Sequence, residues 1–308
     1  MDKNSNILIC GLHKIVNKAF LRRFKRDGFT KVEDASDISL DLTSQIEVDD
    51  HFKTYMPSIV IYTGSISGGI AANMKRPAEF IYNNMISEAN VIHSAKVVGA
   101  DKLLFFASSC IYPKKSLQPI KEEYLLSGPL EQTSEPYAVS KIAGLKACQA
   151  YNQQYNRSFI VAVPATVYGP EDDFDPENAH VISALISRFH DLKQSGQKTI
   201  KIWGSGEPRR EFIFTDDLAD AGMVLLDKYS QNSHINVGTS VDYSISELAE
   251  LITETAGFKG EIIYDKSRPD GVRQKLLDSS KLNSLGWSSK TSLKDGVRIT
   301  YEWFKKYQ

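Results

Sequence analysis

The chain has few cysteines, no excess of charge of one sign and no long apolar run. Its three cysteines, Cys10, Cys110 and Cys148, are an odd number without metal-ligand spacing, so neither a disulfide framework nor a zinc site is indicated. The net charge of −1 and the pI of about 6.6 exclude a global basic field for nucleic acid or an anionic membrane. No segment approaches the roughly 20 apolar residues of a membrane span, and the N-terminal apolar run is too short for a signal peptide. We therefore expect a cytoplasmic protein with no nucleic-acid, membrane or metal partner.

The 308 residues, 42% of them hydrophobic and 24% charged, suffice for one large or two fused globular domains. Short apolar runs alternate with helical patterns: strands are predicted at 7–10, 58–62, 102–107 and 159–164, and helices near 15–27, 76–98 and from Tyr137. This alternation predicts an α/β fold, with a Rossmann-type doubly wound parallel sheet in a dinucleotide-binding domain over residues 1–165. The pattern then changes to a polar loop and shorter elements. Residues 166–308 are expected to form mainly a smaller C-terminal α+β substrate domain, with parts packing back on the first.

Two segments carry the candidate chemistry. Ser108 and Cys110 follow the predicted strand 102–107, at the edge where open α/β sheets bind ligands. Tyr137 and Lys141 are four residues apart and share one face of a helix. Lowering a tyrosine pKa from about 10 to near neutrality needs roughly 4 kcal/mol, which a close lysine can largely supply. The pair therefore predicts a proton donor for neutral pH; on an arbitrary helix it would be a solvated or half-buried pair.

Further motifs lie before, within and after these two segments, from residue 68 to residue 271. They are residues 68–73 (GGIAAN), 77–82 (PAEFIY), 108–113 (SSCIYP), 135–137 (EPY), 178–181 (NAHV), 203–206 (WGSG), 210–212 (REF) and 269–271 (PDG). Together they resemble the extended short-chain dehydrogenase/reductase superfamily and, within it, the GDP-L-fucose synthases. The resemblance runs from about Ser65 to the C-terminus.

The resemblance implies a sugar nucleotide held between two domains and a hydride passed from a reduced nicotinamide to a C4 ketone. Tyr137 would protonate the developing alkoxide, with Lys141 lowering its pKa and holding the nicotinamide ribose. Ser108 would hydrogen-bond the same oxygen. Cys110 and His180 would be the acid/base pair that inverts C3 and C5, since protons α to a ketone are acidic enough for a thiol and an imidazole. The alternative for His180 alone is a surface-loop histidine.

The same resemblance implies residues for the two ligands. Arginine forks suit a diphosphate, and an indole can stack on a base, although Trp203 could equally be a core residue. The implied substrate contacts are Arg188, Trp203, Arg210, Asp270 and Lys275. The implied coenzyme contacts are Gly11, His13, Lys14, Asp37, Asp41, Ser108, Tyr137, Lys141, Pro164, Val167 and His180.

The first predicted strand–helix turn departs from this pattern. A dinucleotide-binding turn needs three spaced glycines, but residues 11–17 read GLHKIVN and keep only Gly11. Lys14 and Asn17 stand where side chains normally obstruct the pyrophosphate, although Lys14 could pair with a phosphate. The acidic stretch 33–37 after the second strand would repel a 2′-phosphate and suits a ribose diol, which favours NAD(H) over the NADP(H) usual in the family. Residues 63–67 and 165–167 also differ from the family pattern near the bound coenzyme.

The predicted function is 3,5-epimerisation and NAD(P)H-dependent 4-reduction of a GDP-4-keto-6-deoxy sugar for polysaccharide synthesis. Two alternatives follow from the loss of two glycines in the turn at residues 11–17. One is an epimerase that works without coenzyme turnover, and the other is a non-catalytic subunit that binds a GDP-sugar. A related sugar, such as a heptose, would change only the substrate. Helices 76–98 and 137–155 carry apolar residues on more than one face, which predicts a homodimer rather than a monomer.

Overall fold

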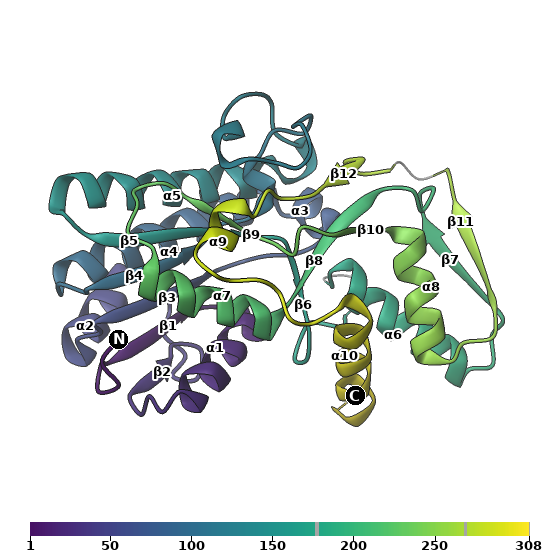
Figure 1. The fold of residues 1–308 in the computed structure, drawn as a ribbon, viewed down its shortest axis with the longest axis horizontal. Helices are drawn as coiled ribbons and strands as arrows, with labels where there is room; N and C mark the ends of the chain where they lie inside the picture. The colour runs from purple at the N-terminus through teal and green to yellow at the C-terminus, as the bar shows by residue number, and fades with distance from the viewer. Residues whose placement is uncertain (176–178, 268–269, 308) are drawn as a thin grey trace.

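The computed structural model describes residues 1–175, 179–267 and 270–307. Its centre is a six-stranded sheet in the order β2-β1-β3-β4-β5-β9, with every neighbouring pair parallel (Figure 1). The strands are β1 (Ile7–Gly11), β2 (Val32–Asp34), β3 (Ile59–Gly64), β4 (Lys102–Phe106), β5 (Ser158–Pro164) and β9 (Ile235–Val237). The strand order reverses between β1 and β3, and in open α/β sheets ligands bind at the carboxyl ends of the strands at such a point.

Helices cover the sheet in two layers. Helix α1 (Lys14–Arg26) packs against α7 (Thr215–Lys228), whereas α4 (Pro77–Val97) packs against both α2 (Gln45–Tyr55) and α5 (Glu135–Tyr155). The strands are almost wholly buried because both faces are covered, as the continuous apolar runs predict. The Rossmann-type doubly wound fold is thereby confirmed. Among the described residues no helix is long and apolar enough to cross a membrane.

The second half of the chain builds a smaller region with its own core, to the right of the main sheet in Figure 1. Strand β8 pairs with β6, β10 and β12, and β7 pairs with β11. The strands are β6 (Thr166–Tyr168), β7 (Thr199–Trp203), β8 (Arg209–Phe214), β10 (Asp242–Ser244), β11 (Glu261–Asp265) and β12 (Gln274–Lys275). The helices are α6 (Val181–Gln194), α8 (Ile245–Ala256) and α10 (Leu293–Tyr307).

Three later segments return to the first region. Helix α7 packs on α1, strand β9 extends the main sheet beside β5, and the short helix α9 (Ser280–Ser284) contacts β9. A short helix, α3 (Ile70–Lys75), precedes α4 on the other side of the sheet. The chain therefore crosses several times between the main sheet and the smaller region.

Candidate active site

The turn after β4 holds a hydroxyl and a thiol at the carboxyl edge of the main sheet. Ser108 is extended, and its Oγ accepts a hydrogen bond of 3.3 Å from the backbone N–H of Cys110, which starts a 3-10 turn over Ser109–Ile111. The hydroxyl of Tyr112 donates to the Oδ1 of Asn236 on β9 at 2.6 Å. These bonds fix the turn, so Ser108 and Cys110 keep a set orientation.

Tyr137 lies in the first turn of α5, against the edge of the Phe80 ring. The sequence predicts a lowered pKa for Tyr137, and this prediction is wrong for the structure. Burial raises the pKa, and the charges of Cys110 and Glu88 raise it further against an opposing hydrogen bond with Ser108. At neutral pH Tyr137 is therefore a protonated phenol.

Lys141 follows Tyr137 by one helical turn, as predicted, but its strongest partner is elsewhere. Its Nζ lies 5.6 Å from the centroid of the Tyr137 ring and only 2.9 Å from the Oε1 of Glu88 on α4. Both charged side chains are buried. The sequence pattern does not predict Glu88, because glutamate is rarely buried and its partner lies on another helix.

A cation lies beside the thiol of Cys110. The Nζ of Lys275, on β12, is 3.5 Å from the Sγ of Cys110. Burial alone would raise the thiol pKa, but the positive charge of Lys275 and hydrogen bonds with Ser108, Lys275 and Ser134 outweigh it and hold the pKa below its ordinary value. The thiolate is therefore favoured at this position. Lys275 is predicted as a substrate contact, and the structure also gives it this protein partner.

Two histidines meet at the same edge. His180 immediately precedes α6, and its ring stacks on that of His13 from the β1–α1 turn, with centroids 6.4 Å apart and an interplanar angle of 10°. Burial, followed by the nearby His180 and Lys141, lowers the pKa of His13 to about 3. His13 is therefore neutral at ordinary pH and faces His180. Asn178 of the predicted NAHV motif lies outside the described residues.

The β1–α1 turn keeps its first glycine for a steric reason. Gly11 has φ +136°, and a Cβ there would lie 2.3 Å from the Oγ1 of Thr63. Asn17 is buried below the turn rather than projecting across it: its Nδ2 donates to the carbonyl of Gly11 at 2.9 Å and to the Oδ1 of Asp34 at 3.0 Å. Its Oδ1 accepts from Thr63 at 2.7 Å. Asn17 thus differs from the expected obstruction, and the side chain of Lys14 is exposed.

The acidic stretch begins inside β2 rather than after it. Asp34 is buried at the end of β2, and its Oδ2 has no hydrogen-bond partner and lies 3.8 Å from the Nζ of Lys18. The side chain of Asp34 has no exposed surface, so this oxygen is not presented to a ligand. The predicted Asp37 pairs with Lys18 at 3.0 Å, and Asp41 accepts from the backbone and hydroxyl of Thr43. Asp37 is thus the exposed carboxylate beside the end of β2, whereas Asp34 is held inside the turn.

The other predicted coenzyme contacts lie where β5 passes into β6. Pro164 ends β5 opposite Val237 of β9, and Val167 lies in β6 opposite Ile213 of β8. Both side chains are half-buried. This crossing joins the main sheet to the smaller region, so the two residues lie at the junction but have no polar side chain to bind a ligand.

The predicted substrate contacts lie in the smaller region. Trp203 ends β7 and is 65% exposed, so the alternative that it is a core residue is wrong. Arg210 on β8 donates from Nη1 to the carbonyl of Val272 at 2.6 Å, and the carboxylate of Asp270 accepts from the N–H and the hydroxyl of Ser205 at 2.8 Å each. The guanidinium of Arg188 on α6 donates to the carbonyl of Lys201. Pro269 of the PDG motif lies outside the described residues.

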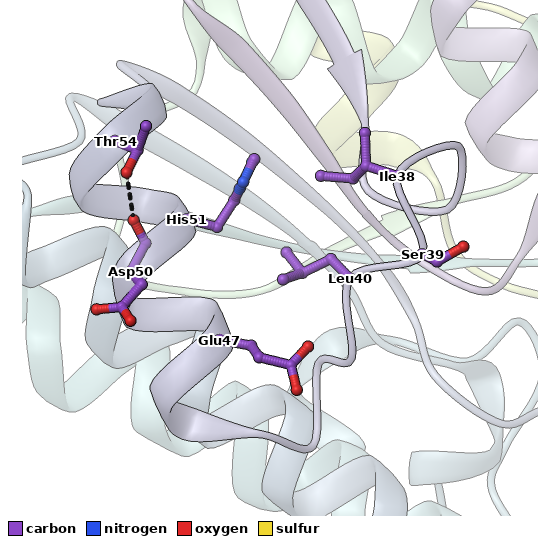
Figure 2. A pocket seen from close by; sticks show the side chains of 7 residues that line it. All are labelled: Ile38, Ser39, Leu40, Glu47, Asp50, His51 and Thr54. Atoms are coloured by element: carbon purple, nitrogen blue, oxygen red, sulfur yellow. Dashed lines mark hydrogen bonds between the residues drawn. The ribbon is translucent and has the colours of Figure 1, made fainter.

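The structure also has a surface hollow away from these groups. Figure 2 shows it between α2 and the segment after β2, with a volume of about 390 Å³, and none of the predicted catalytic residues lines it. Within the described residues, no group of three or more His, Cys, Asp or Glu side chains could hold a metal ion. The predicted catalytic residues Ser108, Cys110, Tyr137 and His180 lie instead in the segment after β4, in the first turn of α5 and just before α6.

Comparison with known proteins agrees with this geometry. The model of the NAD dependent epimerase/dehydratase family matches residues 12–238. The chain belongs to this family. It is 49% identical to a putative GDP-L-fucose synthase 2 of Arabidopsis thaliana, covering 99% of this chain and 93% of the relative, and 42% identical to the GDP-L-fucose synthase of Escherichia coli K12, covering 98% and 97%. A GDP-6-OMe-4-keto-L-xylo-heptose reductase from C. jejuni superposes with a TM-score of 0.93 at 36% identity, covering 100% of this chain and 99% of that one.

Family membership confirms the resemblance that the motifs indicate. The matched segment also includes most of the first strand–helix turn, which departs from the glycine pattern of the family. Residues 12–17 lie inside the matched segment although two of the three expected glycines are replaced. The family match therefore does not depend on a glycine-rich turn. As a member of this family, the chain is an NAD(P)-dependent enzyme of the epimerase/dehydratase type.

Proposed function

We propose that this enzyme epimerises C3 and C5 and reduces C4 of a GDP-4-keto-6-deoxy sugar. The observation that carries the proposal is the meeting of two separate sets of groups at one sheet edge. Ser108, Tyr137 and Lys141 form the set for a ketone reduction, and Cys110 with His180 form the set for proton transfer at the neighbouring carbons. Relatives named GDP-L-fucose synthase, 42–49% identical over nearly the whole chain, support the GDP-sugar as substrate.

Reduction requires a proton donor at the C4 oxygen. The coenzyme, when bound, supplies the hydride. Burial raises the pKa of Tyr137, so the phenol carries its proton at neutral pH and can donate it to the developing alkoxide. Ser108 is hydrogen-bonded to Tyr137 and can donate to the same oxygen.

Epimerisation requires a base at C3 and C5 and an acid on the opposite face. Cys110 is the base, because the ammonium of Lys275 favours its thiolate. His180 is the acid, held at the start of α6. The carbon acid is weak, but the adjacent C4 ketone delocalises the negative charge as an enolate, so a thiolate suffices.

The charge around β2 favours NAD(H) as the coenzyme. Asp34 and Asp37 place two carboxylates beside the end of β2, where a 2′-phosphate would meet negative charge. The exposed carboxylate of Asp37 can instead accept a hydrogen bond from a ribose hydroxyl. Gly11 and Gly64, both at positive φ, let the backbone approach a pyrophosphate closely.

The smaller region supplies the nucleotide site. Arg188 and Arg210 can pair with the diphosphate, and the exposed indole of Trp203 can stack on the guanine. Asp270 is held by Ser205 in the same region. A cytoplasmic site of action stays a prediction.

We also propose a homodimer formed through α4 and α5. The two helices pack side by side, and each exposes large apolar side chains that the main sheet does not cover. These are Tyr82, Met85 and Val97 on α4, and Val139 and Tyr155 on α5. A second copy of the same helix pair would bury them in a four-helix arrangement.

The test is incubation with GDP-4-keto-6-deoxy-mannose in D₂O, with NADH or NADPH. We expect oxidation of the coenzyme and deuterium at C3 and C5 of the product. Tyr137→Phe should stop coenzyme oxidation and leave deuterium uptake, whereas Cys110→Ala should stop deuterium uptake. Deuterium uptake without coenzyme oxidation in the wild type would favour the epimerase-only alternative, and GDP-sugar binding with neither reaction would favour the binding subunit.

A further inference from the structure

A buried carboxylate lies behind the candidate proton donor. The side chain of Glu88, on α4, is 2% exposed, and that of Lys141, on α5, is 1% exposed. The Oε1 of Glu88 and the Nζ of Lys141 are 2.9 Å apart. Burying a charged pair away from water is expensive and does not by itself stabilise a fold, so such a pair calls for another explanation.

The crossing of α4 and α5 has space for this carboxylate because residue 144 is glycine. A Cβ on Gly144 would lie 2.5 Å from the Oε2 of Glu88 and 2.5 Å from the Cζ of Phe105. Any other residue would therefore displace the carboxylate or the ring. The glycine therefore lets the two helices approach closely beside the Glu88–Lys141 pair.

Aromatic rings enclose the ammonium on its other sides. The Nζ of Lys141 lies 5.2 Å from the ring centroid of Tyr62, 5.4 Å from that of Phe105 and 5.6 Å from that of Tyr137. Ring faces attract a cation, but they do not offset its charge as a carboxylate does. Glu88 therefore supplies the carboxylate that faces this ammonium; burial raises the pKa of Glu88, and the charge of Lys141 opposes that rise.

The other titratable groups near the pair stay neutral or point elsewhere. Burial raises the pKa of Tyr62 on β3 and of Cys148 on α5 well above their ordinary values, so both remain protonated. His13, on the β1–α1 turn near Lys141, is neutral for the reason given above. From α2, Asp49 accepts a hydrogen bond from Ser94 of α4, more than a helical turn beyond Glu88. Cys110, after β4, is the exception: its thiol pKa is lowered, and its charge raises the pKa of Tyr137 together with that of Glu88. The charge next to Tyr137 is thus set by Cys110, Glu88 and Lys141.

We propose that Glu88 is a positioning residue for the reduction: it anchors the ammonium of Lys141 and sets the pH at which Tyr137 loses its proton. This inference rests on the proposed function. Without the carboxylate, the ammonium of Lys141 has no buried counter-charge, and the negative charge that opposes ionisation of Tyr137 is gone. Both effects favour the phenolate, so proton loss from Tyr137 moves to lower pH.

The test is the pH profile of kcat for ketone reduction in Glu88→Gln, which keeps the shape and removes the charge. We expect the alkaline limb to move down by about one pH unit or more. Deuterium exchange at C3 and C5, which depends on Cys110 and His180, should keep its wild-type profile. Glu79→Gln, on the same helix but exposed, is the matched control and should leave both profiles unchanged.

An alkaline limb that stays within about 0.3 pH units of the wild type in a folded Glu88→Gln protein would overturn the proposal, since a change that small reflects almost no loss of interaction. If Glu88→Gln does not fold, Glu88→Asp keeps the charge but draws it back from Nζ, and the limb should move down by a smaller amount. An unmoved limb in that variant overturns the proposal as well. A wild-type protein that never reduces the ketone would refute the proposed function itself, whereas reduction with an unmoved limb refutes only the role of Glu88.

Discussion

The Nζ of Lys275 lies 3.5 Å from the Sγ of Cys110, although the two residues are 165 positions apart in the chain. Lys275 belongs to the short strand β12, which pairs with β8 of the smaller region, whereas Cys110 follows β4 of the main sheet. The contact therefore crosses between the two regions. The reactivity of the thiol depends on both being in place.

Replacing Lys275 should raise the pH at which epimerisation begins. The thiolate acts as base only above the thiol pKa, and Lys275 lowers that pKa. Lys275→Met should therefore move the acidic limb of deuterium exchange at C3 and C5 up by roughly one pH unit. Lys306→Met, on the exposed end of α10, is the control and should leave the limb in place. Equal limbs in wild type and Lys275→Met would show that Lys275 does not set the thiol pKa.

Asn17 should contribute to stability, because it joins three strand ends below the β1–α1 turn. Asn17→Ala removes one buried hydrogen bond each from Asp34 and Thr63, which keep Ser36 and the carbonyl of Cys10 as their other partners. It should lower the free energy of unfolding by about 1–3 kcal/mol. Urea denaturation followed by circular dichroism measures this change. Asn83→Ala, which removes only a local bond to the carbonyl of Glu79, should change stability by less than about 0.5 kcal/mol. A loss as small in Asn17→Ala would contradict the structural role.

The main sheet could be predicted from the sequence because its strands are continuous apolar runs, whereas other elements could not. Helix α2 buries only Val48 and Phe52, so its apolar pattern is weak, and β9 has three residues. The Ser108, Tyr137 and Lys141 positions followed from local spacing.

The contacts that set the charge of the site were beyond sequence reasoning. Glu88 contacts Lys141, and Lys275 contacts Cys110, only because elements far apart in the sequence pack together. The effect of burial on Tyr137 was missed for the same reason: helical spacing shows which groups share a face, but not how much water reaches them.

The coenzyme preference should depend on the charge of Asp34. Asp34→Asn removes a buried negative charge at the end of β2 and keeps an oxygen that can accept from Ser36. The affinity for NADPH relative to NADH, measured by calorimetric titration, should rise about tenfold or more. The reason is that the variant has one negative charge fewer to repel the 2′-phosphate. Asp295→Asn is the control, because Asp295 lies in the first turn of α10 in the smaller region. A wild-type protein that already prefers NADPH would contradict the assignment of NAD(H).

A charge on the exposed face of α4 should prevent dimerisation. Met85 is 42% exposed beside other apolar side chains, and Met85→Arg would place a guanidinium inside the proposed interface. Sedimentation velocity should show a dimer for the wild type and a monomer for this variant. Ile46→Arg, on the exposed face of α2, should remain dimeric. A wild-type monomer would refute the proposed dimer.

The hydrogen bond between Tyr112 and Asn236 determines when the turn after β4 can reach its final structure during synthesis. The side chain of Asn236 also donates to the carbonyl of Ile120, and its backbone N–H donates to the carboxylate of Glu122. One residue of β9 thus holds three points of the segment from Tyr112 to Glu122. Strand β9 leaves the ribosome long after β4, and domains generally form as units once their chain is available. During synthesis, the turn that carries Ser108 and Cys110 therefore lacks its bond to Asn236 until β6, α6, β7 and β8 of the smaller region have been made. A nascent chain that stops before β9 carries the thiol of Cys110 without this support.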